Sequence, residues 1–253
     1  MKRSVQTNPV QTNPVFSLLH PTARPLGANG WQTAAEAWVS SAKEWNSFEY
    51  VLSIHRRQAE LPNSVGIDWY EYYDSTRCWF EDNIGPYVIL GINILAPTMV
   101  NNGNCAALCS SGLVLVDVND DLFPCQDWDE KLLNAIARAG KKLTDEFVIK
   151  VNHGSYQPKL ITHPVISRAY FERIGPVDPR YLGYGCDDEL TEHAYRDGVV
   201  IEAPEILWEH RHHSNGLRAA DALDAHNARP EVWEAKEKIR AARRAEGFPK
   251  VQL

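Results

Sequence analysis

Short runs of aliphatic and β-branched residues alternate along this chain with segments of helical periodicity, and this alternation constrains the fold more than any other feature. The runs Phe16–His20, Glu49–Ile54, Leu113–Val118 and Phe147–Val151 have the length of buried strands. Between them, apolar residues recur at the three- and four-residue spacing of a helix. Strands that alternate with helices usually form parallel sheets, so we expect an α/β fold with a mostly parallel central sheet flanked by helices.

The helical spacing is clearest in two places. It predicts one helix from Trp31, capped by Asn29, and a second over Trp128–Ile136. We expect a turn-rich aromatic stretch over Trp69–Trp79, ahead of another apolar run, Tyr87–Leu95. In parallel sheets, ligands bind beyond the carboxyl ends of the strands, so the residues that directly follow each apolar run are the candidate site residues.

The two ends of the chain differ from this central pattern. The repeat Gln6–Val10 and Gln11–Val15 contains Asn-Pro pairs that disfavour a helix, and we expect an extended arm over residues 1–13. The α/β domain is expected over residues 14–213 and a helical C-terminal extension over 214–253. Within that extension, Glu231–Arg244 predicts a helix with a concentrated basic patch, either a solvated face or a contact for an anionic substrate or partner. The basic residues of the patch are Lys236, Lys238, Arg240, Arg243 and Arg244.

Charge and composition exclude several classes of protein. The net charge of −7 excludes a uniformly basic nucleic-acid-binding surface. No apolar run approaches the roughly 18 to 20 residues of a membrane helix, so no membrane insertion is expected. Met1, Lys2 and Arg3 are followed by polar residues rather than by the apolar core of a signal peptide. The 5 cysteines show no paired metal-binding spacing, which favours reduced thiols and a cytoplasmic location.

The strand-like run Leu113–Val118 leads directly into Asn119, Asp120 and Asp121. Neighbouring carboxylates repel each other unless a positive charge lies between them, and hard divalent cations take oxygen ligands of this kind. The segment therefore indicates a metal site. The alternative is a simple turn ahead of Pro124.

A second acidic cluster, Asp187, Asp188 and Glu189, follows a glycine-containing loop and begins a helical pattern. Acidic residues in a first helical turn are favoured by the helix dipole and by capping. Three in succession exceed what capping requires, so a carboxylate here is also a candidate general base.

Histidines are concentrated in the segment Trp208–His213. If this segment is extended, His210 and His212 point to the same side and can share a transition metal, whereas His213 points away. The alternative is that these histidines are structural.

Taken in order, these motifs resemble a glycosyltransferase of the GT-A type, close to the family-2 pattern of nucleotide-diphospho-sugar transferases. In that pattern a strand ends in a metal-binding acidic motif, a later helix begins with an acid pair that holds the catalytic base, and a strand end carries a metal-ligating histidine. The resemblance covers most of the chain, from Phe16 to His212. Its parts are Phe16–Pro25, the helix from Trp31, Glu49–Ile54, Asn101–Ala106, Leu113–Pro124, Pro164–Tyr170, Asp187–Leu190 and Glu209–His212.

The resemblance implies a role for each matching residue. Asp121 is the main metal-ligating acid, His210 or His212 completes the metal shell, and Asp188 is the catalytic base, with Asp187 as its neighbour. The remaining residues contact the nucleotide sugar: His20, Thr22 and Arg24 in the loop after Leu19, Asn102 and Asn104 at the opening of a helix that ends near Ser110–Gly112, and Asn119 and Asp120 near the ribose or the metal.

The resemblance also implies the reaction. It is the transfer of a hexose or pentose from a nucleotide-diphosphate sugar, with a UDP-sugar favoured, to an acceptor hydroxyl, with inversion and with Mn²⁺ or Mg²⁺ as cofactor. Two positions depart from the family pattern. Asn119 replaces the first Asp of the acidic motif, and Ser53–His55 stands where the family supplies an Asp that reads the nucleotide base.

Two other functions fit part of the same pattern. A metal-dependent hydrolase of nucleotide sugars would also cluster Asp and His, with the metal activating water. A non-catalytic nucleotide-binding module would account for Asn119 and the basic C-terminal helix. For a transferase the acceptor stays open between a saccharide, a protein side chain and a hydroxylated DNA base, because the aromatic stretch Trp69–Trp79 could stack on either sugars or bases.

Overall fold

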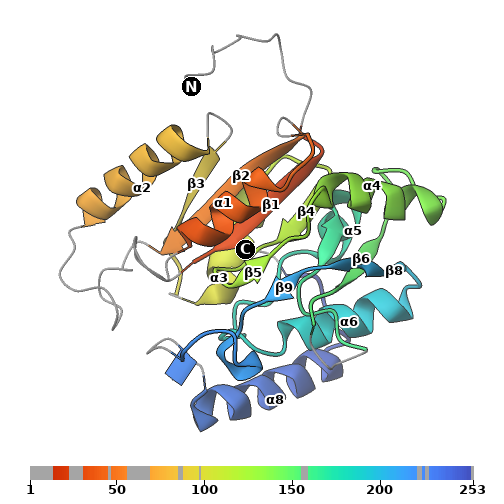
Figure 1. The fold of residues 1–253 in the computed structure, drawn as a ribbon. Helices are drawn as coiled ribbons and strands as arrows, with labels where there is room; N and C mark the ends of the chain where they lie inside the picture. Colours follow the sequence, from red (N-terminus) through yellow and green to blue (C-terminus); the bar gives the residue numbers. More distant parts are fainter. Residues whose placement is uncertain are drawn as a thin grey trace.

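The computed structural model describes residues 14–22, 31–44, 47–55, 69–84, 88–96, 98–154, 159–220, 224–225 and 228–251, and the side chains of all of these except 69–73 (Figure 1). The expected N-terminal arm, Arg24 and the expected cap Asn29 lie outside these residues.

Within the described part of the chain, a seven-stranded sheet has the order β3-β2-β1-β4-β7-β6-β8. The pairs β1–β2, β1–β4, β2–β3 and β6–β8 are parallel, and only β7 runs antiparallel to its neighbours β4 and β6. The expected mostly parallel sheet is therefore confirmed. The strands are β1 (Phe16–Pro21), β2 (Phe48–His55), β3 (Val88–Asn93), β4 (Val114–Asp117), β6 (Val148–Asn152), β7 (Val165–Ser167) and β8 (Val200–Leu207), and a separate antiparallel pair is formed by β5 (Leu122–Phe123) and β9 (Glu209–His210).

Helices cover both faces of this sheet (Figure 1). Residues of α1, α2 and α4 belong to the larger apolar core on one face, and residues of α3, α5 and α6 belong to the core on the other. The helices are α1 (Gln32–Ser40), α2 (Trp69–Asn83), α3 (Met99–Cys109), α4 (Trp128–Arg138), α5 (Arg168–Ile174), α6 (Cys186–Arg196) and α8 (Pro230–Ala245), with a 3-10 turn, η2, at His213–Asn215.

The central strands are apolar on both sides because both of their faces are covered. In β2, Tyr50 and Leu52 pack into the larger core, whereas Val51 between them packs into the core on the α3 side. Successive strand side chains point to opposite faces, so a strand buried on both faces reads as a continuous apolar run. This is why the strands could be recognised from the sequence.

The expectation of turns over Trp69–Trp79 is wrong, because this stretch lies in the helix α2. Thr76 and Phe80 are buried one helical turn apart, and Trp79 packs against the larger core. Trp31 stacks on Phe80 with ring centroids 4.8 Å apart and meets Trp79 edge-on at 4.9 Å. Packing of these aromatic rings stabilises a helix that residue propensity alone does not favour.

Two helix starts also differ from expectation. The first helix begins at Gln32 with Trp31 at its N-cap position. The helix expected to open near Asn102 begins earlier, at Met99, because the Thr98 hydroxyl accepts a hydrogen bond from the Asn101 amide at 3.1 Å.

The buried carboxylate of Glu49 in β2 links β1 and the segment before β4 at the amino ends of these strands. Glu49 accepts hydrogen bonds from the hydroxyl groups of Ser17, at 2.7 Å, and Ser111. It also accepts from the backbone amides of Ser111 and Gly112. A Cβ at Gly112 would lie 2.5 Å from the Ser17 hydroxyl oxygen and 2.8 Å from the backbone of Phe16. Only glycine allows β1 and the start of β4 to approach this closely.

Among the described residues, no helix combines the length and apolar character needed to span a membrane. All five cysteines are free thiols, in line with the expected reduced state.

Candidate active site

A cavity of about 760 Å³ opens beyond the carboxyl ends of β1, β2 and β4. The starts of α3 and α6, the segment that follows β9, and α8 complete its wall. It lies where the sheet topology predicts a ligand site, and most of the sequence-predicted site residues line it.

At the end of β4, Asp120 is held by a buried chain of polar groups. His20 Nε2 lies 2.9 Å from Asp120 Oδ1, and its Nδ1 is hydrogen-bonded to the Tyr50 hydroxyl. Burial, followed by the charge of Asp120, raises the pKa of Tyr50 well above its usual value. The His20 side chain is fully buried, so it orients Asp120 and does not line the cavity.

Asp121 lies beside His210 because the strands β5 and β9 pair. Leu122 is opposite His210 in this small sheet, and the Arg211 amide donates to the Asp121 carbonyl at 2.7 Å. As a result, Asp121 Oδ1 is 3.4 Å from His210 Nε2, while Asp121 Oδ2 is 3.3 Å from the Arg218 guanidinium. The structure therefore brings together a predicted carboxylate and a predicted imidazole that are far apart in sequence.

His212 lies just beyond the end of β9 and directly before the 3-10 turn η2. The strand ends at His210, and His212 is the N-cap residue of η2, where its Nδ1 accepts a hydrogen bond from the Ser214 amide at 3.3 Å. The backbone of His212 is extended, with φ −67° and ψ 145°, and its ring centroid lies 5.3 Å from that of His210. His212 also belongs to a group with His213 and Asp224 that could bind a metal, in which Asp224 Oδ1 lies 3.3 Å from His213 Nδ1. Burial lowers the pKa of His212.

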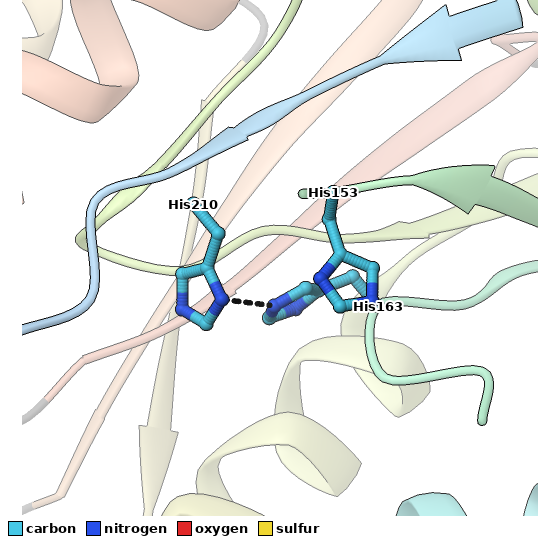
Figure 2. A group of neighbouring side chains, drawn as sticks. All are labelled: His153, His163 and His210. Carbon is cyan, nitrogen blue, oxygen red and sulfur yellow. Dashed lines mark hydrogen bonds between the residues drawn. The ribbon is translucent and has the colours of Figure 1, made fainter. Parts of the chain in front are cut away.

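Two histidines that the sequence reasoning missed, His153 and His163, lie next to His210 (Figure 2), and a carboxylate that it also missed, Asp117, lies beside His163. His163 Nε2 is 3.5 Å from His210 Nδ1. On the other side of the same ring, His163 Nδ1 is 3.0 Å from the side-chain nitrogen Nδ2 of Asn119 and 3.5 Å from Asp117 Oδ2. Burial, with the nearby His163 and His210, lowers the pKa of His153 to about 4. His153 directly follows an apolar run, and Asp117 lies within one, so position at a strand end could have found both; nothing local marks His163.

The predicted asparagines line the cavity, but their amides hold backbone in place. Asn102 donates to the carbonyl of Thr22 at 3.1 Å and accepts from Asn93 at 2.8 Å. Asn104 donates to and accepts from the backbone of Val177, at 2.7 and 2.9 Å. They therefore position the segment after β1 and the loop before α6, both of which line the cavity.

The acid pair at the start of α6 divides into two environments. Asp187 Oδ1 accepts from the amides of Gly185 and Asp188, at 3.2 and 3.0 Å, and its pKa is raised by burial and by the Asp188 charge. Asp188 instead pairs with two cations of α8, with Lys236 Nζ at 2.8 Å and Arg240 Nη1 at 3.3 Å. Asp187 therefore takes the capping role, and Asp188 is left to face α8.

The basic patch of α8 contacts the acidic residues of α6. Besides Lys236 and Arg240, Arg243 is buried against Glu189, with Arg243 Nη2 to Glu189 Oε1 at 2.6 Å. The interpretation of this patch as a solvated face is wrong for these residues. Near Lys236, the rings of Tyr184 and Trp233 stack at 4.7 Å on the wall of the cavity, and Trp233 is 47% exposed.

No protein-family model matches the sequence, and no curated protein matches it. Among solved structures, the mannosyltransferase PcManGT from Pyrobaculum calidifontis, in complex with GDP-Man and Mn²⁺, aligns with a TM-score of 0.56 and 15% identity over 92% of this chain and 76% of that chain.

S. aureus TarS aligns with a TM-score of 0.56 and 10% identity over 76% of this chain. The same values hold for TarS 1-349 in complex with UDP. The chain spans 36% of TarS and 59% of that shorter TarS chain. These likenesses concern the fold alone, and they confirm the expected GT-A type fold, a mostly parallel central sheet flanked by helices.

Proposed function

We propose that this chain is a metal-dependent glycosyltransferase that moves a sugar from a nucleotide-diphosphate sugar to an acceptor hydroxyl with inversion. One observation carries the proposal. On a GT-A type fold, a single cavity gathers carboxylates that follow β4 and carboxylates that begin α6, at the carboxyl ends of the parallel strands. These are the two kinds of group that the transfer needs, one for the leaving diphosphate and one for the attacking hydroxyl.

The donor side of the cavity is suited to a divalent cation. Carboxylate oxygen from Asp121 and imidazole nitrogen from His210, with His212 nearby, form a mixed oxygen and nitrogen donor set for a divalent cation such as Mn²⁺. When bound there, a cation stabilises the negative charge that grows on the departing diphosphate. Thr22, Asn102, Asn104, Asn119 and Asp120 line the space proposed for the nucleotide sugar, for which a UDP-sugar is our first candidate.

The acceptor side contains the proposed base. As the acceptor oxygen forms its bond to the anomeric carbon and the bond from that carbon to the diphosphate breaks, Asp188 takes the hydroxyl proton. Lys236 and Arg240 hold the Asp188 carboxylate in one orientation. Asp187 is the second candidate, because burial and the charge of Asp188 raise its pKa.

The stacked rings of Tyr184 and Trp233 lie on the same wall as Lys236. A flat, exposed aromatic surface beside a base can bind the face of a sugar or of a nucleobase. We therefore place the acceptor here and keep a saccharide, a protein side chain and a hydroxylated DNA base as the acceptor classes to be screened.

Calorimetric titration with nucleoside diphosphates, in Mn²⁺ and in chelator, tests the donor site. We expect the affinity for the nucleoside diphosphate to depend on the cation. In Asp121→Ala this affinity should fall by about 10-fold to 100-fold, as for loss of a group that supports a metal. Asp74→Ala, which removes an exposed carboxylate of α2, is the matched control and should bind like the parent. Equal affinity in chelator and in Mn²⁺ would contradict the proposal.

Turnover of the nucleotide sugar separates transfer from hydrolysis. A transferase consumes the donor slowly until an acceptor is supplied, whereas a hydrolase of nucleotide sugars consumes it at full rate in water alone. Full-rate consumption without an acceptor would therefore replace the proposed transferase by the hydrolase.

A further inference from the structure

Three histidines from three separate segments meet on the floor of the cavity (Figure 2). His153 follows β6, His163 precedes β7 and His210 ends β9. Each offers a ring nitrogen within 4.8 Å of those of the other two. His153 and His163 are 7% and 4% exposed, so the cluster is shielded from bulk water on the side away from the cavity.

Two of these rings have the support that metal-ligating histidines usually have. His163 directs Nε2 toward the cluster, while its Nδ1 lies 3.0 Å from Asn119 Nδ2 and 3.5 Å from Asp117 Oδ2. His210 directs Nδ1 toward the cluster while its Nε2 lies 3.4 Å from Asp121 Oδ1. A carboxylate behind the imidazole fixes the ring orientation and makes the inward nitrogen a better donor.

The spacing of the inward nitrogens fits a small cation. His163 Nε2 and His210 Nδ1 are 3.5 Å apart. Two nitrogens bound at tetrahedral angles to one Zn²⁺ ion lie about 3.3 Å apart, given Zn–N bonds of about 2.0–2.1 Å.

His153 supplies an independent observation. Its Nδ1 is buried and has no hydrogen-bond partner among the described residues. Leaving a buried polar nitrogen unpaired destabilises the folded chain, and a ligand at the cluster would offset that cost.

We propose that His153, His163 and His210 bind one transition cation of the Zn²⁺ class, with a further coordination position open to the cavity. Three imidazoles select late first-row metals over Mg²⁺, which prefers oxygen ligands, and three protein ligands with an open position are typical of catalytic rather than structural sites. This deepens the proposed function and rests on it only for the use of the cation in transfer. It names the class of cation and replaces the donor set proposed above: His153, His163 and His210 are the ligands, and Asp121, on the other side of the His210 ring, is a positioning residue rather than a ligand.

Titration of the metal-free full chain with Co²⁺, without nucleotide, tests the donor set directly. We expect one Co²⁺ per chain with the visible absorption of nitrogen-ligated cobalt, displaced by Zn²⁺ but not by excess Mg²⁺. His153→Ala and His163→Ala should each weaken Co²⁺ binding by more than about 100-fold, whereas Asp121→Ala should weaken it by only about 10-fold to 100-fold.

His213→Ala is the matched control, because it removes an imidazole from the neighbouring group with Asp224. This variant should leave the cobalt spectrum unchanged. Loss of the spectrum in His213→Ala alone would overturn the assignment, and so would a Co²⁺ affinity of His153→Ala equal to that of the parent. Melting curves of His153→Gln with and without Zn²⁺ separate lost binding from lost folding, since Zn²⁺ should raise the Tm of the parent only. Nucleotide titration in the same preparations shows separately whether the proposed function fails.

Discussion

At the residue scale, Asp188 and Asp187 are adjacent in sequence but have different partners, and one substitution separates chemistry from binding. In Asp188→Asn the proton acceptor is lost while size is kept. We expect donor affinity near that of the parent and single-turnover transfer reduced by about 10² to 10⁴-fold. The lost pairing with Lys236 and Arg240 should cost about 1 kcal/mol of stability, because these ion pairs are partly exposed. Transfer at the parent rate would remove Asp188 from the mechanism and leave Asp187 as the candidate.

Asp187 predicts a pH dependence of stability at the same scale. Its pKa in the folded chain is raised from 3.8, first by burial and then by Asp188, so the native state binds this proton more tightly than the unfolded state does. Its contribution to stability is therefore present below pH 3.8 and is lost as the pH rises through the raised pKa. We expect Asp187→Asn to be more stable than the parent at pH 8, with a smaller difference at pH 4, in urea unfolding at both values. A gap that does not change with pH would contradict this.

At the scale of elements, the docking of α8 on α6 depends on the buried pair of Arg243 and Glu189. Arg243 is 4% exposed, and Glu189 also accepts from the Tyr181 hydroxyl at 2.8 Å. Arg243→Met leaves a buried carboxylate without its cation, which typically costs about 3–5 kcal/mol. Lys238→Met, on an exposed part of the same helix, should change stability by less than about 0.5 kcal/mol.

Urea unfolding measures both variants. If Glu189→Gln in the Arg243→Met background recovers part of the loss, the cost belongs to the uncompensated charge rather than to lost packing. Equal costs for Arg243→Met and Lys238→Met would show that the pair does not hold the two helices together.

At the scale of the whole molecule, a ligand that bridges both sides of the cavity should stabilise the folded chain by mass action. A nucleoside diphosphate with its cation at about 100 times its Kd contributes about 2.7 kcal/mol. For a chain of this length that corresponds to a rise in Tm of roughly 5–10 °C. We expect UDP or GDP with Mn²⁺ to give this shift in a thermal melt, and chelator to abolish it. A panel of nucleotides without any cation-dependent shift would argue against a nucleotide-sugar site.

Much of the fold and part of the candidate site could be predicted because their signals are local. The run Leu113–Val118 has apolar residues at successive positions, as expected for a strand of a parallel sheet that is covered on both faces. Because ligands bind beyond the carboxyl ends of such strands, the run also predicts that Asp120 and Asp121 lie at the ligand edge. The acid pair at Asp187 and Asp188 likewise follows from the preference of helix starts for acidic side chains. The helix over Trp69–Asn83 could not be predicted in this way, because its aromatic residues are helical only once Trp31 packs against them.

The sequence by itself therefore determined the class of fold, the parallel strands β1, β2, β3, β4 and β6, the acidic end of β4 and the acidic start of α6, since each depends on residues a few positions apart. Only the tertiary structure decided which of the nine histidines meet. The pairing of β5 with β9 brings His210 to Asp121, and the antiparallel strand β7 brings His163 into the same cluster. Such contacts depend on strand register and on packing between distant segments, and no local periodicity encodes them.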